Sequence, residues 1–185
     1  MNLLSLSLQK ISEHPALISQ PVSIFFGKGI IDVTDISVME IDPGFSDTTE
    51  FCSHYGVTPA DCANCVILQA KRGDRTWYAA CMVLGSTRAD VNGLARRHLD
   101  ARSVSFAPME TACQLTQMEY GGITPIGLPL GWPILLDNAV AETPYVIIGS
   151  GIRGSKIILP GALLALLPGA VVLEGLGKST HNDTL

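Results

Sequence analysis

Short apolar runs separated by turn residues dominate the pattern of this chain. β-Branched residues partly alternate with polar ones over residues 33–41, and apolar runs recur at 64–69 and 76–84 with Gly73-Asp74 between them. Alternation with these residue types predicts strands, and the Gly-Asp turn predicts that the last two runs form a hairpin. Further apolar strands are predicted at 104–106, 132–137, 145–148 and 155–159.

The predicted helices are short and have clear end signals. Asp47 precedes a predicted helix that stops at Gly56, and Asp90 precedes one that runs through Leu99. Asp favours the N-cap because its carboxylate accepts free helix N–H groups, and Gly tolerates the left-handed residue that follows a helix. Two more helices are predicted over 109–115 and 160–167.

Strands and short helices interleave without a regular βαβ period. This order predicts an α/β (α+β) single domain in which a curved, mixed β-sheet is packed by short helices. A chain of 185 residues is long enough to bury one substantial core. We divide it into an N-terminal helical or extended lead-in over 1–37, with a short helix in its first 22 residues, a main domain over 38–177 and a flexible tail over 178–185.

Composition excludes several classes of protein. Apolar residues make up 47% of the chain and charged residues 16%, which is typical of an ordered globular domain. The longest apolar stretch, residues 157–173, is interrupted by Pro and Gly and is shorter than the ~20 residues of a membrane span. Five cysteines without a recognisable signal peptide favour reduced thiols in a cytoplasmic protein. We therefore expect no membrane partner.

The net charge bears on nucleic-acid binding. A value of −5 argues against a surface that coats DNA or RNA generally, and we expect no DNA partner. A local basic patch for RNA stays open as an alternative. Its candidate members are Arg88, Arg96, Arg97, Arg102, Arg153 and Lys156.

Two glycine loops carry the strongest candidate chemistry. The first runs from Tyr120 to Gly127 and the second from Gly149 to Lys156. Glycine allows close backbone approach and leaves N–H groups bare, as a small acyl group, phosphate or nucleotide requires, although such loops also serve as plain turns. Neither matches a dinucleotide fingerprint or a Walker loop, so no nucleotide cofactor is expected. Arg153 and Lys156 add cations that suit a phosphate, or else are solvated.

Other reactive residues give weaker signals. Cys62 and Cys65 have the CxxC spacing of a redox pair or half a zinc site, but no second motif completes a site. We interpret them as buried structural thiols and expect no metal. The histidines are scattered, and nothing nominates a Ser-His-Asp triad. Asp137 ends an apolar strand, where its carboxylate either faces a pocket or begins a turn.

Taken in order, these residues resemble the YbaK-type aminoacyl-tRNA editing family. The order is Gly121-Gly122-Ile-Thr-Pro125-Ile-Gly127, then Asp137, then Gly151-Ile-Arg153-Gly154, with Thr116 just ahead of the first loop. The family includes the insertion domain of bacterial prolyl-tRNA synthetases and free-standing deacylases that clear mischarged tRNA. The resemblance runs from about residue 38 to about residue 175 and implies a compact α/β domain without metal or cofactor.

The resemblance also implies an activity and a set of site residues. The activity is hydrolysis of the ester between a mischarged small amino acid and tRNA, with aminoacyl-tRNA, tRNA-Pro included, as the partner. The glycine loop would hold the acyl group and offer amides to the developing oxyanion. The implied catalytic residues are Asn64, Gly121 and Gly122. The implied substrate-binding residues are Thr116, Ile123, Pro125, Gly127, Asp137, Gly151, Arg153 and Lys156.

One position departs from the family pattern. Alignment on Gly56-Val-Thr-Pro59 places Asn64 where editing enzymes carry a lysine near the phosphate of the terminal adenosine. Asn donates hydrogen bonds but supplies no charge. Either Lys71, Lys156 or Arg153 replaces that cation, or the substrate differs, or hydrolysis has been lost. The alternative function is a non-catalytic module that binds the 3′ end of tRNA, an amino acid or a nucleotide.

Overall fold

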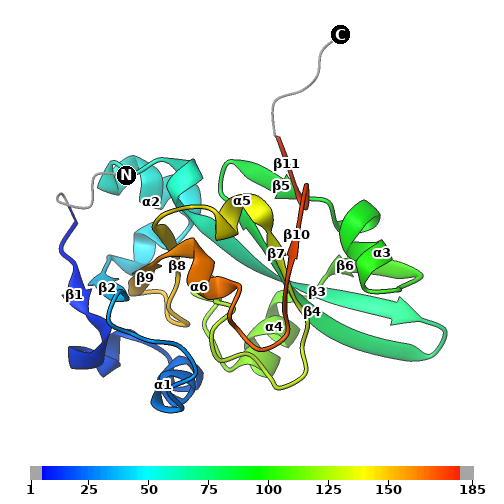
Figure 1. Ribbon diagram of the computed structural model, residues 1–185, viewed down its shortest axis with the longest axis horizontal. Helices are drawn as coiled ribbons and strands as arrows, with labels where there is room; N and C mark the ends of the chain where they lie inside the picture. The colour runs from blue at the N-terminus through cyan, green and yellow to red at the C-terminus, as the bar shows by residue number, and fades with distance from the viewer. Residues whose placement is uncertain (1–5, 180–185) are drawn as a thin grey trace, which may run out of the picture.

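Two sheets form the frame of the protein in the computed structural model, which describes residues 6–179 (Figure 1). The first sheet is antiparallel, in the order β1 (Gln9–Lys10), β2 (Ser37–Glu40), β9 (Ser155–Leu159), β8 (Val146–Gly149). The second is mixed, in the order β10 (Ala170–Leu173), β7 (Ile134–Asp137), β4 (Arg75–Leu84), β3 (Ala63–Arg72), β6 (Ser103–Phe106). A small pair joins β5 (Thr87–Ala89) to β11 (Gly177–Ser179).

The two larger sheets meet at the beginning of β3. Cys62 forms a parallel bridge with Ile147 of β8, whereas β6 pairs with the far half of β3, over Leu68 to Lys71. One edge of β3 therefore has β8 beside its start and β6 beside its end, and the edge is uncovered between them. The predicted mixed α/β domain with short helices is confirmed, with its sheet divided into two linked parts.

The predicted hairpin is present, because β3 and β4 pair in register around the turn at Gly73, whose φ is 58°. The predicted capped helix is α2 (Thr48–Tyr55), and it ends at Gly56 with φ 68°. Helix α4 (Met109–Thr116) also lies where the pattern predicts a helix. Local signals determined these elements because each depends on a cap or a turn next to it in sequence.

Asp90 does cap a helical segment, but the segment is not a regular helix. Its carboxylate accepts from the N–H groups of Gly93 and Leu94, each at 3.0 Å. The chain then makes a π-helical turn over Val91–Ala95 before the short helix α3 (Arg96–His98).

Several expected boundaries differ from those observed. The lead-in forms β1, two 3₁₀ turns and helix α1 (Gln20–Gly27), while residues 1–5 lie outside the described part. The strand expected at 33–41 is only β2, because the Asp32 carboxylate accepts from the Thr34 N–H and closes a turn there. The helix expected at 160–167 is shorter, as α6 (Gly161–Leu164).

The C-terminal tail begins later than expected. Lys178 and Ser179 pair with Arg88 and Thr87 in the β11–β5 ladder rather than belonging to a flexible tail. Residues 180–185 of the expected tail lie outside the described part of the chain.

The largest core fills the space between the two sheets. Val38 of β2, Leu136 of β7 and Ile157 of β9 are all fully buried in it. Helix α5 (Asn138–Ala141) adds Val140 to the same cluster. Burial of side chains this size stabilises the fold by roughly 1.5–3 kcal/mol each relative to exposure. This packing holds the two sheets against each other.

Candidate functional site

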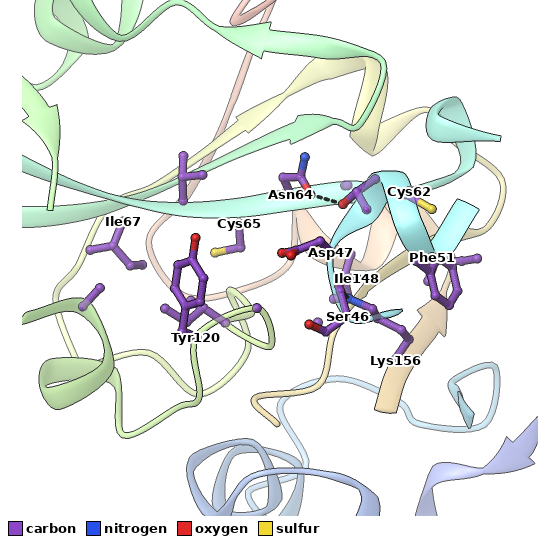
Figure 2. Close-up of a pocket in the computed structure, with 18 of the residues that line it drawn as sticks. Ser46, Asp47, Phe51, Cys62, Asn64, Cys65, Ile67, Tyr120, Ile148 and Lys156 are labelled. Atoms are coloured by element: carbon purple, nitrogen blue, oxygen red, sulfur yellow. Dashed lines mark hydrogen bonds between the residues drawn. The ribbon is translucent and has the colours of Figure 1, made fainter. Parts of the chain in front are cut away.

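A cavity of about 600 Å³ opens where β8 and β6 diverge along β3 (Figure 2). Its wall comes from five parts of the chain: the start of α2, the first half of β3, the end of β6 with α4, the glycine loop after α4, and β8 with β9. That volume is typical of a site for a small molecule or for one end of a larger ligand. We call the uncovered part of the β3 edge between β8 and β6 the fork. The site is built around this fork.

The open edge of β3 offers backbone groups to this cavity. The Cys62 carbonyl accepts from the Gly85 N–H on the β4 side, whereas the Ile67 carbonyl accepts from the Ala107 N–H on the opposite side. Alternate residues of a strand direct their backbone groups to opposite edges. The N–H and C=O of Cys65 therefore face the fork, where neither β8 nor β6 reaches to pair with them.

Lys156 is the buried cation of the cavity wall. It enters from β9, is 7% exposed, and its Nζ donates to the Ser46 carbonyl over 2.6 Å. The same Nζ lies 5.6 Å from the centre of the Phe51 ring, which adds a cation–π contact. Burial lowers the pKa of Lys156 from its ordinary value, and the nearby Cys62 and Asp47 partly oppose that shift.

Asn64 lies in the wall but is engaged with its neighbour. The Thr48 hydroxyl donates to the Asn64 Oδ1 over 2.5 Å, which ties β3 to the first turn of α2. In Figure 2 the amide nitrogen of Asn64 points away from Lys156. The positive charge in this cavity therefore comes from β9, not from the start of β3.

Ser46, just before α2, holds an unsatisfied hydroxyl beside the same cation. The residue is 1% exposed, and its Oγ has no hydrogen-bond partner within residues 6–179. A Cβ built on Gly121 would lie 2.9 Å from this Oγ, so the hydroxyl sits directly against the glycine loop. A buried polar atom without a partner is costly, and a ligand or water is its usual partner.

The two glycine loops bind each other. The Gly151 N–H donates to the Gly122 carbonyl over 2.7 Å, and the Gly122 N–H donates to the Glu119 carbonyl over 3.0 Å. A Cβ on Gly122 would lie 2.4–2.8 Å from backbone atoms of Ile152. Close approach of two backbones is thus the reason for glycine at 122, and its N–H is already in use.

The family match comes from the sequence itself. The profile of the aminoacyl-tRNA editing domain matches residues 42–166, which include every segment that lines the cavity. The chain belongs to this family. Among curated proteins, no sequence matches the chain significantly.

Solved structures share the editing-domain fold. One, described as a candidate trans-editing enzyme for prolyl-tRNA synthetase, has 21% identity and a TM-score of 0.71 and covers 88% of this chain and 99% of its own. A second, described only as hypothetical, has 18% identity and a TM-score of 0.73 over 86% of this chain and 100% of its own. A computationally designed epitope scaffold has 20% identity and a TM-score of 0.69 over 88% and 99%. At these identities the likeness shows the fold alone.

The editing domain brings some of the predicted site residues together. Those that line the cavity are Asn64, Gly121, Ile123 and Lys156. Those that lie outside its lining are Thr116, Gly122, Pro125, Gly127, Asp137, Gly151 and Arg153.

The residues outside the lining have structural partners. The Thr116 hydroxyl donates to Ala112 within its own helix over 2.8 Å. A Cβ on Gly127 would lie 2.5 Å from the Pro21 carbonyl oxygen, and one on Gly151 would lie 2.0 Å from the Ser19 Oγ. These glycines therefore permit contacts with the lead-in segment.

Arg153 braces the glycine loop from outside the cavity. Its guanidinium donates to the Tyr120 carbonyl over 3.0 Å and to the Pro43 carbonyl over 3.1 Å. Its own N–H donates to the Glu119 carboxylate over 2.7 Å. The side chain thus connects the loop to the turn that precedes α2.

Asp137 anchors the C-terminal segment of the editing domain. Burial raises the pKa of its carboxyl, while backbone N–H groups of Gly177, Leu176 and Asn138 hold the carboxylate and oppose that rise. Of the two alternatives open at sequence level, the structure thus gives it backbone partners rather than a place in the cavity wall.

Sequence reasoning missed the polar start of α2. Ser46, Asp47 and Thr48 all line the cavity, as does the half-exposed Tyr120. Asp47 and Thr48 were recognisable only as the capped start of a helix, because a cap signal does not tell where the helix points, and Ser46 carried no signal. Tyr120 was within the first glycine loop but carried no separate signal.

The thiols of the CxxC segment are part of the wall without forming a metal site. Cys62 and Cys65 line the cavity, and the Cys62 Sγ lies 3.6 Å from the Cys52 Sγ. Burial raises the pKa of both Cys62 and Cys65. Over residues 6–179, no three His, Cys, Asp or Glu side chains cluster as metal ligands would.

The described residues, 6–179, contain no helix that is long and apolar enough to span a bilayer.

Proposed function

We propose that the protein is a trans-acting deacylase that hydrolyses the ester between a mischarged small amino acid and tRNA. The observation that carries this proposal is Lys156, a buried ammonium group in the wall of the cavity that the glycine loop also lines. It supplies the charge that Asn64 lacks. Membership of the editing family makes aminoacyl-tRNA the expected substrate class.

The donors near Lys156 suit the reaction. The ester carbonyl oxygen binds between the Lys156 ammonium, the Ser46 hydroxyl and the backbone of Gly121, all of which line the cavity. A water molecule attacks the carbonyl carbon, and the negative charge that develops on oxygen is stabilised by these preorganised donors. The bond to the ribose oxygen then breaks, the proton from water passes to that oxygen, and free amino acid and tRNA leave.

The apolar part of the cavity suits a small side chain. Ile67, Ala112, Ile123 and Ile148 line it together with the Cys65 thiol. These groups offer no charge, so an uncharged amino-acid side chain is the one they accept without a desolvation cost. Most of the cavity volume is then left for the ribose and the terminal base.

The alternative is a binding module without catalysis. Asn64 stands at the family's lysine position, and its side chain is held by Thr48. In this alternative the Lys156 ammonium serves only to bind the terminal nucleotide. The protein would then bind tRNA or an amino acid without hydrolysing an ester.

Deacylation of Cys-, Ala- and Ser-charged tRNA-Pro separates the two functions. Wild type is compared with Lys156→Met and with Lys71→Met, an exposed lysine of β3 outside the cavity. We expect hydrolysis of at least one species, a loss of ~100-fold or more in Lys156→Met, and no change in Lys71→Met. Tight tRNA binding by a wild type that hydrolyses none of the three would establish the binding module instead.

A further inference from the structure

The cavity contains a carboxylate that the proposed hydrolysis does not use. Asp47 occupies the N-cap position of α2, yet its side chain makes no capping hydrogen bond. The residue is exposed and lines the cavity. Figure 2 shows its carboxylate directed into the cavity, toward the side of Cys65 and Tyr120 and away from Lys156.

Asp47 is not neutralised by a direct ion pair. Among residues 6–179 the ion pairs are Lys10–Glu13 and Arg72–Asp100. Lys156 is the other charged group of the lining, and its ammonium is bound to the Ser46 carbonyl. The Asp47 carboxylate is therefore an accessible negative charge in the cavity that can bind a cationic group of a ligand.

Donors and acceptors are separated across the cavity. The Ser46 hydroxyl lies against the glycine loop, and the Lys156 ammonium is bound to the carbonyl of the same residue. The Asp47 carboxylate points the other way, toward β3, where the edge of Cys65 adds a backbone carbonyl. An α-aminoacyl ester has the matching groups, because its ammonium nitrogen is a donor for a carboxylate and its carbonyl oxygen, on the adjacent carbon atom, is an acceptor for an ammonium or hydroxyl group.

We propose that Asp47 binds the α-ammonium group of the aminoacyl ester, so that the site selects esters with a free α-amine over N-acylated ones. This inference rests on the proposed deacylase function and adds the group that is recognised. Carboxylate–ammonium pairs are among the stronger polar contacts in proteins, and N-acylation removes both the charge and donors. The site then leaves peptidyl-tRNA and other N-acylated tRNA intact.

Binding of non-hydrolysable analogues tests Asp47 separately from catalysis. The probes are 3′-alanylamino-3′-deoxyadenosine and its N-acetyl derivative, titrated calorimetrically into wild type, Asp47→Asn and Glu50→Gln. Asn is also a good N-cap residue, so α2 stays intact in the variant. Glu50 is the matched control, because it is an exposed acid in the first turn of the same helix and lies outside the cavity lining.

Wild type and Glu50→Gln are expected to bind the free-amine analogue at least ~10-fold more tightly than the N-acetyl derivative, and Asp47→Asn to bind both within about twofold. The wild-type preference should fade above about pH 8, where an α-amine loses its proton. The ionisable groups that line the cavity around Asp47 are Lys156, Cys62, Cys65 and Tyr120.

Two results overturn this role. A preference for the free amine that is unchanged in Asp47→Asn shows that another group binds the amine. A loss of hydrolysis in Asp47→Asn with an unchanged ratio of analogue affinities shows that Asp47 acts on water instead. The deacylase proposal fails by a different observation, the absence of hydrolysis by wild type, so the two failures are distinguishable.

Discussion

The Nζ of Lys156 lies 2.6 Å from the carbonyl oxygen of Ser46, a residue 110 positions earlier in the chain. This contact joins β9 to the turn that begins α2, and it holds a charged group against apolar neighbours. Burying this charge costs more desolvation free energy than burying a neutral hydrogen-bond donor would. Retaining it is understandable if the ammonium serves a ligand in the cavity.

Lys156→Met is expected to abolish hydrolysis while keeping or raising stability at neutral pH. Because burial lowers the folded-state pKa of Lys156, its charge opposes folding below that pKa, and stability rises as pH increases from it toward the unfolded value. Met removes this cost, and water in the cavity can serve the Ser46 carbonyl. Urea denaturation of wild type and Lys156→Met at pH 7 measures this difference in stability. A marked loss of stability would mean that the ammonium is needed for folding.

The pH dependence of hydrolysis should also follow Lys156. If the protonated amine is required, kcat/KM, corrected for spontaneous ester hydrolysis, decreases at a pH below the ordinary lysine value of 10.5, because the pKa of Lys156 is lowered by burial. Lys156→Arg, in which the guanidinium stays protonated, is expected to retain part of the activity and to lack this decrease. The same decrease in both proteins would point to a different titrating group.

Gly122→Ala is expected to destabilise the protein by about 2–3 kcal/mol, because its Cβ would overlap backbone atoms of Ile152 that cannot move independently. Gly27→Ala is the control, since a Cβ there meets nothing within 4 Å and Gly27 lies in helix α1. Thermal unfolding of both variants measures the difference. Equal stabilities would show that the two loops separate without cost.

The cysteines should react in an order set by burial. Cys62 is buried and burial raises its pKa, so little thiolate forms at pH 8, whereas Cys113 is partly exposed on α4. Iodoacetamide is expected to modify Cys113 first and Cys62 only after unfolding. Peptide mass spectrometry of timed samples identifies the order, with fully unfolded protein as the control. Early modification of Cys62 would indicate that its thiol is accessible from the cavity in the folded protein.

Asp137→Asn is expected to change stability without changing catalysis. The carboxylate is held by backbone N–H groups near Gly177, outside the cavity, so kcat/KM should stay within about twofold of wild type. Its folded-state pKa is raised, so ionisation opposes folding, and wild-type stability decreases as pH rises from about 3.8 through that pKa. In Asp137→Asn this decrease should be absent. A large decrease in kcat/KM would show that Asp137 takes part in the reaction.

Much of the local structure was predictable because its causes are local. The cap at Asp90, the stop at Gly56 and the hairpin turn at Gly73 each depend on residues a few positions apart. The helix expected over 160–167 was too long, because only Gly161–Leu164 is helical. Helix ends after a proline depend on how neighbouring elements pack, and the sequence pattern does not contain that information.

The sequence by itself determined the family, the mixed α/β fold and the presence of glycine loops at 120–127 and 149–156. It did so because the order of glycines, prolines and apolar strands survives as a linear pattern. It also raised Lys156 as one of three possible replacements for the family's lysine at Asn64. Nothing in the linear order could choose among Lys71, Lys156 and Arg153.

Only the tertiary structure decided which groups meet. The divergence of β8 and β6 along β3 brings Lys156 and Asp47 to one cavity, whereas Arg153, three residues before Lys156, points to the outside of the loop. Neighbours along a strand or loop face different directions, so sequence proximity does not predict shared surroundings. The site forms in the fork between β8 and β6. That fork depends on packing between core residues that are far apart in sequence.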